Sequence, residues 1–235
     1  MTDTPIIVFA RLDSRRLPGK ALLPLTGRPM LARVVARCVQ ATVAGPVVVA
    51  TTDRPGDDPI AGLAAELGVA VFRGDAEDVA ARALSCADAY AARQFVRISG
   101  DSPFIDAELI DMFVQRHRTT GAALTTNLHP RSFVPGMSIE IIDTAAMHAV
   151  LAASSDPHDR EHVTPALYRT LPPRRILNVA SDVTPPAGLS LAVDTADDLS
   201  FCAAILSVLG PRADSAGYGE ILDAASALAA QQVAQ

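Results

Sequence analysis

The sequence has few cysteines, no apolar run long enough to span a bilayer and no excess of positive charge. Its three cysteines (Cys38, Cys86 and Cys202) are odd in number and far apart, which excludes a disulfide framework and a Cys-x-x-Cys metal site. No run approaches the roughly 18 apolar residues of a membrane helix, and no signal-peptide pattern precedes Ile6. The net charge of −6 excludes non-specific binding to nucleic acid or anionic membranes. We expect a soluble cytoplasmic protein with reduced cysteines.

The composition is that of an ordinary globular protein, with 49% hydrophobic and 20% charged residues in a chain of 235. A chain of this length can bury a sizeable core in one large α/β domain or two small ones. Short apolar runs at 6–10, 47–50, 69–72 and 95–99 alternate with helical patterns at 29–43, 57–67 and 76–92. This alternation predicts a Rossmann-like, mostly parallel sheet with helices on both faces.

The pattern is looser after Gly121, where further strand patterns cover 122–126, 137–142, 176–179 and 189–193. Residues 143–170 have a helical pattern that Pro157 and Pro165 interrupt, and two amphipathic helical patterns follow the last strand pattern. We find no internal repeat and no long linker. The sequence predicts a single domain over residues 1–235, with residues 122–185 as an arm or subdomain inserted into the sheet.

A cationic loop with a Pro-Gly turn directly follows the first strand pattern, over residues 10–20. Backbone N–H groups freed by the turn, guanidinium forks and one ammonium are donors that suit phosphate oxygens. The loop is not a Walker A motif, because Ser14 stands where the first glycine is needed and Ala21 follows Lys20 in place of Ser or Thr. The loop is therefore a candidate triphosphate cradle, and a solvated basic surface loop is the alternative.

Two aspartates directly follow strand patterns. Asp101 comes after the strand that ends at Ser99, and Asp194 comes after the one that ends at Val193. Ligands of open α/β sheets bind beyond the carboxyl ends of the strands, so we expect both carboxylates to meet the cationic loop there. Two carboxylates that leave room for water and phosphate oxygens are typical of a Mg²⁺ site. A helix cap is the alternative for each aspartate taken alone.

These motifs together resemble the cytidylyltransferases that activate acidic sugars. The resemblance is to the spore coat polysaccharide biosynthesis type, with KDO and sialate cytidylyltransferases as more distant relatives. The motifs that carry it are Ala10-Arg11-x-x-Ser14-x-Arg16-Leu17-Pro18-Gly19-Lys20, Val49-Ala50-Thr51-Thr52, Val71-Phe72-Arg73-Gly74, Gly100-Asp101-x-Pro103-x-Ile105-Asp106, Arg160-Glu161-His162-Val163-Thr164-Pro165 and Val193-Asp194-Thr195-x-Asp197-Asp198-Leu199.

The resemblance implies a fold of the nucleotide-diphospho-sugar transferase type, in which CTP and an acceptor give a CMP-linked product and pyrophosphate. The implied nucleotide-binding positions are Ala10, Arg11, Ser14, Arg16, Gly19, Lys20 and Arg73, the implied Mg²⁺ ligands are Asp101 and Asp194, and the implied catalytic residues are Arg11, Lys20 and Asp101. We expect Thr51, Thr52 and Asp53 to contact the cytosine. A homodimer that forms through residues 122–185 would match the resemblance.

The expected acceptor is a small anion, by default a 2-keto acidic sugar, with sugar phosphates and phosphonates as further candidates. Its expected contacts are Arg131, Glu140, Arg160, Glu161 and His162. Relatives commonly have Gly-Leu-Asp-Val-Glu where this chain has Gly-Met-Ser-Ile-Glu at 136–140, so Ser138 replaces an expected carboxylate. This departure predicts that the acceptor is handled differently here.

Three other functions are alternatives at this stage. His158-x-x-Glu161-His162 matches the pattern of one class of zinc peptidases, but Pro157 and Pro165 leave too short a helix for such a site. A glycosyltransferase that consumes a nucleotide sugar would keep the fold, although Ser102-Pro103 stands where its Asp-x-Asp motif is usual. The third is a nucleotide-binding module without catalysis. Release of pyrophosphate from CTP separates these alternatives from a cytidylyltransferase.

Overall fold

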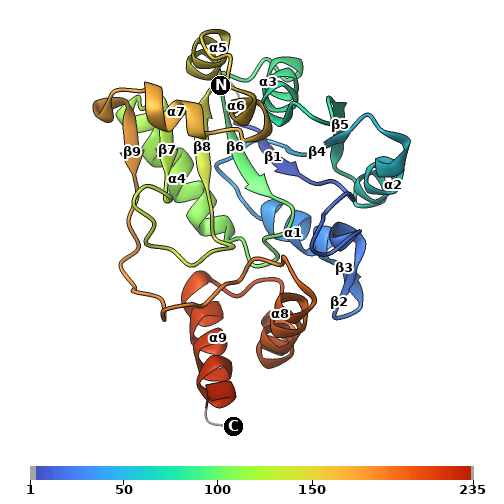
Figure 1. Cartoon of the computed structure of the whole chain (residues 1–235). Helices are drawn as coiled ribbons and strands as arrows, with labels where there is room; N and C mark the ends of the chain where they lie inside the picture. Colours follow the sequence, from blue (N-terminus) through green and yellow to red (C-terminus); the bar gives the residue numbers. More distant parts are fainter. Residues whose placement is uncertain (1–3, 234–235) are drawn as a thin grey trace.

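Seven strands form one mostly parallel sheet in the computed structural model, which describes residues 4–233 (Figure 1). The strand order is β5-β4-β1-β6-β8-β7-β9. Their bounds are β1 Ile6–Phe9, β4 Val47–Thr52, β5 Ala70–Gly74, β6 Gln94–Ser99, β7 Leu124–Thr126, β8 Glu140–Asp143 and β9 Ile176–Asn178. Strand β8 is antiparallel to both of its neighbours, whereas the other pairs of this sheet are parallel. The predicted fold class is confirmed.

Helices cover both faces of the sheet, as the alternating pattern predicted. The helices α1 (Met30–Cys38), α2 (Asp58–Glu66) and α4 (Ala107–Thr120) pack on one face, and α3 (Val79–Ala89), α5 (Thr144–Ala152) and α7 (Pro165–Thr170) pack on the other. In β1, Ile6 and Val8 belong to the first core and Ile7 to the second, because successive side chains of a strand point to opposite faces. Shorter elements are η1 Lys20–Leu22, the hairpin β2 Pro24–Leu25 and β3 Arg28–Pro29, η2 Pro55–Asp57, α6 Pro157–Glu161, η3 Pro173–Arg175 and η4 Gly210–Arg212.

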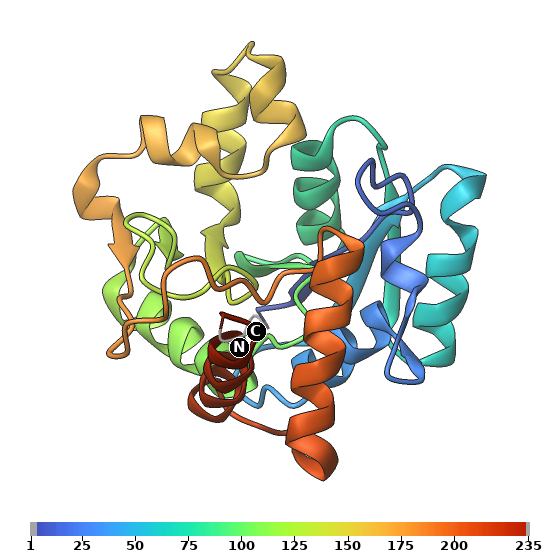
Figure 2. The same cartoon turned by 60° about the horizontal axis from the view of Figure 1, so that its bottom comes forward.

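A third core lies between the two C-terminal helices and the loops beside the sheet. Helix α8 (Ala196–Leu209, orange in Figure 2) and α9 (Tyr218–Val233) enclose it. Side chains from the loops of residues 133–137 and 189–193 complete it. The C-terminal part of the chain is thereby held against the segments that follow the central strands.

The predicted strand at 189–193 is wrong, because this segment pairs with none of the strands in residues 4–233. Its buried side chains alternate as in a strand, but they pack in the third core. The Leu191 N–H donates to Pro135 O at 2.8 Å, so the segment runs beside another loop. Gly136 allows this close approach, since a Cβ atom there would lie 2.5 Å from the Leu191 carbonyl carbon.

The middle of the chain follows the predicted division at its prolines. Residues 143–170 form α5, α6 and α7, and Pro157 and Pro165 each begin a helix. Residues 122–185 supply β7, β8 and β9 to the main sheet, and their predicted role as an arm for the acceptor or for dimerisation stays a prediction. Within residues 4–233, every helix is too short or too polar to cross a membrane.

Candidate active site

A cavity of about 510 Å³ opens at the carboxyl ends of β1 and β6, at the edge of the sheet where parallel-sheet proteins bind ligands. The predicted site residues that line it are Ala10, Arg11, Ser14, Arg16, Lys20, Asp101, Glu161, His162 and Asp194. Its wall also contains residues to which the sequence assigned no role, among them Asp13, Arg15, Arg82, Arg97 and Ser99. The fold therefore gathers side chains from distant parts of the sequence around one space.

The cationic loop of residues 10–20 is held in a turned conformation beside this cavity. The Gly19 N–H donates to Leu12 O at 2.9 Å, and Gly19 has a φ of 71°, which a residue with a Cβ atom adopts only with strain. The buried Asp57 accepts hydrogen bonds from the Leu12 N–H at 2.8 Å and from the Thr52 hydroxyl. These bonds tie the loop to the end of β4 and fix the path along which its cations reach the cavity.

Lys20 lies between the two predicted metal ligands. Its Nζ donates to Asp101 Oδ2 at 2.8 Å, to Asp194 Oδ1 at 2.9 Å and to Val193 O at 2.9 Å. Arg16 forms an ion pair with the other oxygen of Asp194, also at 2.9 Å. Burial lowers the pKa of the Lys20 ammonium, but the two carboxylates outweigh burial and raise this pKa above its usual value. The ammonium is therefore charged at neutral pH.

Asp194 reaches this point from a loop and not from the end of a strand. The Val193 N–H donates to Asp101 O at 3.0 Å, which ties the two segments that carry the aspartates together. Behind them, Thr195 and Asp198 form a capping box at the start of α8, and Asp198 Oδ2 also accepts from the Asp194 N–H at 3.0 Å. The cap of α8 is thus Thr195, which leaves the Asp194 carboxylate for the cavity.

The two aspartates fit a divalent cation. Asp101 Oδ2 and Asp194 Oδ1 converge on one nitrogen, Lys20 Nζ, so their oxygens already point toward a place that a cation occupies. Within residues 4–233, no group of three or more His, Cys, Asp or Glu side chains could hold a metal. A magnesium ion held here would therefore need phosphate oxygens and water as its remaining ligands, which is the usual way that proteins bind it.

Arg82 on α3 is a cavity residue that the sequence analysis missed. Arg82 is only 2% exposed, its Nη1 donates to Asp75 O, and its buried Nε has no partner among residues 4–233. Burial and then the nearby Arg11 lower its pKa. Asp57, Asp75 and Asp13 act on this pKa in the opposite direction. The signal in the sequence was a single arginine inside the helical pattern of residues 76–92.

Glu140 and Arg97 form a buried ion pair at the cavity wall. Arg97 lines the cavity, whereas Glu140, an expected acceptor contact, lies behind that wall with a side chain that is 1% exposed. Arg97 Nη1 donates to Glu140 Oε2 at 2.7 Å, and the Tyr168 hydroxyl donates to Glu140 Oε1 at 2.7 Å. The sequence analysis missed Arg97, although it interrupts the apolar strand pattern at 95–99.

The other expected acceptor contacts are divided between the cavity and its surroundings. Glu161 and His162 line the cavity, but Arg160 lies beside it, with Nη1 3.4 Å from Asp78 Oδ2. Arg131 is exposed outside the cavity, where its Nη1 donates to Ser138 Oγ at 3.3 Å.

The zinc-peptidase alternative finds no support in this geometry. Helix α6 ends at Glu161, so His158 and His162 do not share a long rigid helix, and their ring centroids are 4.5 Å apart. The described part of the chain also brings no third ligand to them.

The residues expected to contact cytosine lie beside the cavity and not in its lining. Thr51 and Thr52 are buried in β4, and Asp53 follows them at the surface. Arg73 Nε donates to Thr52 O at 3.0 Å, and its Nη2 donates to Arg54 O at 2.8 Å. Arg73 thus braces the loop after β4. The contact of Thr51, Thr52 and Asp53 with the base stays a prediction, and so does the binding of nucleotide by Arg73.

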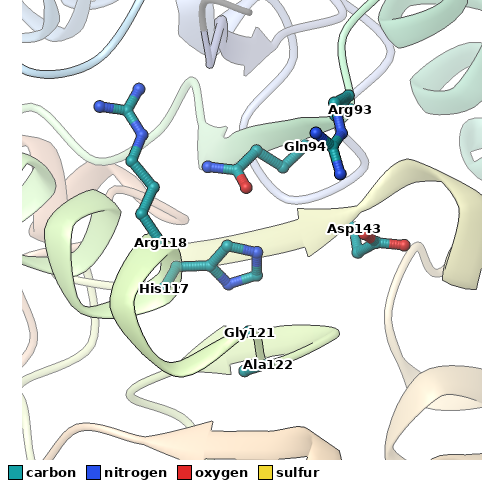
Figure 3. A pocket seen from close by; sticks show the side chains of 7 residues that line it. All are labelled: Arg93, Gln94, His117, Arg118, Gly121, Ala122 and Asp143. Carbon is teal, nitrogen blue, oxygen red and sulfur yellow. The ribbon is translucent and has the colours of Figure 1, made fainter. Parts of the chain in front are cut away.

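A second cavity, of about 470 Å³, lies at the start of β6 and contains none of the predicted site residues (Figure 3). The close-up shows the side chain of Gln94 between Arg93 and Arg118, above His117 of α4. His117 Nδ1 is 2.8 Å from Thr125 Oγ1, and burial lowers the pKa of His117 to about 4, so the ring is neutral at pH 7. Because this cavity lies at the amino ends of the parallel strands, it is not the place where such sheets bind substrates.

Comparison with known proteins shows the family to which this chain belongs. The model of a family described as cytidylyltransferase matches residues 5–183. The spore coat polysaccharide biosynthesis protein SpsF of Bacillus subtilis is 31% identical over 227 residues, which cover 91% of this chain and 90% of that protein. The 3-deoxy-manno-octulosonate cytidylyltransferase of Neisseria meningitidis is 38% identical over 117 residues, or 47% of this chain and 44% of that protein. A solved cytidylyltransferase structure from Leptospira borgpetersenii has a TM-score of 0.90 and 27% identity, and the match covers 98% of this chain and 96% of that one.

Proposed function

Because this chain belongs to the cytidylyltransferase family, we propose that it transfers CMP from CTP to an acidic sugar or a similar small anionic acceptor. The CTP-dependent transfer follows from membership of the family, and our proposal concerns the chemistry of the acceptor. The observation that supports the proposal is the cavity in which the loop of residues 10–20 meets Asp101 and Asp194. A chain of net charge −6 that gathers cations around one cavity attracts an anionic substrate to that place.

The triphosphate of CTP lies, in this proposal, along the cationic loop. An acceptor oxygen attacks the α-phosphorus in line, the bond from that phosphorus to the bridging oxygen breaks, and pyrophosphate leaves with the electron pair. Arg11, Arg16 and Lys20 neutralise the charge that develops on the departing group. The protein forms no covalent bond in this step, so its contribution is the positioning and the charge of these side chains.

We propose that Asp101 and Asp194 bind Mg²⁺ together with phosphate oxygens of CTP. The bound ion would supply additional positive charge at those oxygens. The support for this proposal is the convergence of the two carboxylates on Lys20 Nζ, at 2.8 and 2.9 Å. In the protein without ligands, Lys20 compensates the repulsion between the two carboxylates and keeps them close together.

The acceptor is expected on the side of the cavity formed by Glu161 and His162. The names of two relatives, which refer to spore coat polysaccharide biosynthesis and to 3-deoxy-manno-octulosonate, support a carbohydrate acceptor with an acidic group. Ser138 is held by Arg131 outside the cavity and would contribute to specificity only through the loop that carries both residues.

We also propose that the enzyme works in the cytoplasm as a homodimer. The resemblance supports a dimer, and the buried, unpaired Cys38, Cys86 and Cys202 suit a reducing compartment. Size-exclusion chromatography with light scattering measures the assembly directly. We expect twice the mass of one chain, and the mass of a single chain at micromolar concentration would contradict the dimer.

A screen with pyrophosphate as the readout tests the function. Each of the four nucleoside triphosphates is mixed with Mg²⁺ and a panel of acidic sugars, sugar phosphates, phosphonates and neutral sugars. We expect pyrophosphate with CTP and an anionic acceptor, and none with the neutral sugars. Binding of CTP without pyrophosphate release on any anionic acceptor of the panel would overturn the proposal, and so would a neutral sugar as the best acceptor.

A further inference from the structure

Both carboxylate oxygens of the buried Glu140 accept hydrogen bonds from protein side chains. Glu140 on β8 lies directly opposite Arg97 on β6, and its two oxygens accept from Arg97 Nη1 and the Tyr168 hydroxyl, each at 2.7 Å. A buried ion pair of this kind is often no more stabilising than apolar residues of the same size. The pair therefore calls for an explanation other than the stability of the sheet.

Tyr168 fixes the direction of hydrogen bonding around Glu140. Burial and the neighbouring Glu140 raise the pKa of Tyr168, so the hydroxyl keeps its proton and donates it to the carboxylate. The Thr126 hydroxyl lies 2.6 Å from the Tyr168 oxygen and must then be the donor of that bond. Both oxygens of Glu140 are thus already bonded to protein groups, and its buried side chain is not part of the cavity lining.

Arg97 has donors to spare. A guanidinium group has five N–H donors, and a single hydrogen bond, to Glu140, involves the Arg97 side chain among residues 4–233. Its Nε is buried without a partner in that part of the chain, while the side chain as a whole is 29% exposed and lines the cavity. A rigidly held arginine that faces a cavity with unused N–H groups is a receptor for an anion.

The position of Arg97 separates it from the triphosphate loop. In the sheet, Phe9 is paired with Ser99 and Ile7 with Arg97, so Arg97 lies two residues back from the edge where the loop begins. Two residues of a strand correspond to about 6–7 Å. The loop places four cations on the cavity wall, Arg11, Arg15, Arg16 and Lys20, whereas Arg97 is a single cation paired with Glu140. A highly charged triphosphate is drawn to the loop, and a singly charged group can bind at Arg97.

We propose that Arg97 binds the acidic group of the acceptor, most simply a carboxylate, and that Glu140 and Tyr168 hold its guanidinium in place. This inference rests on the proposed function, because it assigns the acceptor end of the same cavity. In this proposal Glu140 is a positioning residue: it holds Arg97, and Arg97 contacts the acceptor.

The test uses the full chain with CTP and Mg²⁺ and takes pyruvate, a small 2-oxo acid, as the probe. The Nε–H signal of Arg97 is observed by NMR in arginine-labelled protein and assigned by its loss in Arg97→Lys. We expect a saturable shift of this signal on addition of pyruvate over a millimolar range, and no shift with sodium chloride at the same ionic strength. The matched variant Arg93→Gln, which changes the second cavity, is expected to keep the response. If the Arg97 Nε–H signal does not shift on addition of pyruvate, the proposal is overturned.

Kinetics provide a second readout once the screen has identified an acceptor. Arg97→Lys keeps a charge beside Glu140 but loses the planar fork, and the double variant Arg97→Gln/Glu140→Gln removes the pair as a unit. We expect both to raise the acceptor KM about 10- to 100-fold, because a hydrogen bond to a charged group is lost. The KM for CTP is expected to change less than about twofold.

Two outcomes distinguish this inference from the proposed function. If wild-type protein binds CTP but releases no pyrophosphate with any acceptor, the proposed function is wrong. If wild-type protein is active and the Arg97 variants change the KM for CTP, or leave the acceptor KM unchanged, the function stands and the role of Arg97 is wrong.

Discussion

At the scale of single residues, the most consequential side chain is Lys20. It is bonded to two carboxylates and one carbonyl oxygen, with only 15% of its side chain exposed. This environment keeps the ammonium charged, which is what a group that must meet developing charge on pyrophosphate requires. As a consequence, the Lys20 ammonium lies at the point where the carboxylates of Asp101 and Asp194 converge.

Replacing Lys20 by alanine is expected to lower kcat for pyrophosphate release about 10²- to 10³-fold, because one preorganised cation is lost from the transition state. The control is Arg212→Ala, which removes a surface cation that is likewise paired with a carboxylate, Glu220. The control should retain wild-type turnover. A Lys20→Ala enzyme that stays within about tenfold of the wild type would contradict this role.

Asp194 and Asp197 provide a matched pair of substitutions at the start of α8. Asp194 is bonded to Lys20 and lines the cavity, whereas Asp197 is exposed in the first turn of the helix. Asp194→Asn is expected to weaken binding of Mn²⁺ with CTP at least about tenfold, since a carboxylate ligand is lost. Electron paramagnetic resonance of free Mn²⁺ measures this directly. Equal effects of Asp194→Asn and Asp197→Asn would exclude a metal site at Asp194.

At the scale of elements, the segment 189–193 shows how a sheet-like pattern can serve a loop. Its buried side chains, which alternate with partly exposed ones, pack in the third core, and the N–H groups of Leu191 and Val193 donate to Pro135 O and Asp101 O. The segment delivers Asp194 to the cavity as a strand would have done. This arrangement depends on Gly136, where the backbone approaches that of Leu191 and Ala192 closely.

Gly136→Ala is expected to lower the free energy of unfolding by about 2–5 kcal/mol, because left-handed strain of about 1–2 kcal/mol adds to steric overlap with residue 191. Urea denaturation measures this loss. Gly188→Ala is the control: its φ is 77°, but a Cβ atom there meets nothing within 4 Å. The control should lose only about 1–2 kcal/mol. Equal losses in both variants would mean that the overlap at Gly136 relaxes freely.

The contact between α4 and β7 is expected to weaken in acid. His117 of α4 lies 2.8 Å from the Thr125 hydroxyl of β7, and burial lowers the pKa of this histidine to about 4. The unfolded chain, with an ordinary histidine pKa, then binds a proton between about pH 7 and pH 4 that the folded chain does not. Stability should therefore fall through this range by up to about 3 kcal/mol.

His117→Gln provides the comparison, because it removes this titration and leaves the carboxylates unchanged. Denaturation at pH 7 and at pH 4.5 should show a smaller loss in the variant than in the wild type. Identical pH dependence of the two proteins would show that His117 is not protonated on unfolding in this range.

The elements with strong periodicity were predictable, and the partners of buried charges were not. Strands such as β1 and β4 follow from runs of apolar residues, and the starts of α6 and α7 follow from their prolines. Arg82 and Arg97 were overlooked because their roles depend on what packs beside them. Nothing local in the sequence pairs Arg97 with Glu140, since the register of β6 against β8 brings them together.

At the scale of the whole molecule, the active site joins segments that are far apart in the chain. Residues from the loop after β1, the ends of β6 and α6 and the loop before α8 all line one cavity. Two of the motifs quoted from the sequence could indicate this because they directly follow strands: residues 10–20 follow β1 and residues 100–106 follow β6. Their order in space could be inferred from strand topology, whereas the exact distances required the packing of the third core.

A ligand that bridges these segments should stabilise the fold as a unit. At a free concentration of 100 times its Kd, CTP with Mg²⁺ is expected to add about 2.7 kcal/mol to the free energy of unfolding, which a thermal-shift measurement detects. The gain should be much smaller for Lys20→Ala at the same nucleotide concentration. ATP at that concentration serves as the control for base selection. The absence of any shift with CTP would contradict binding to the folded chain.

The enclosed position of Lys20 has a consequence for proteolysis, because it is the single lysine among the 235 residues. A protease that cleaves only after lysine has one target in the chain, and this target is bonded to both aspartates at the centre of the cavity. Cleavage would therefore require the loop of residues 10–20 to leave its place. The rate at which such a protease cleaves the chain into two fragments would report how often the active site opens. A bound nucleotide should lower this rate.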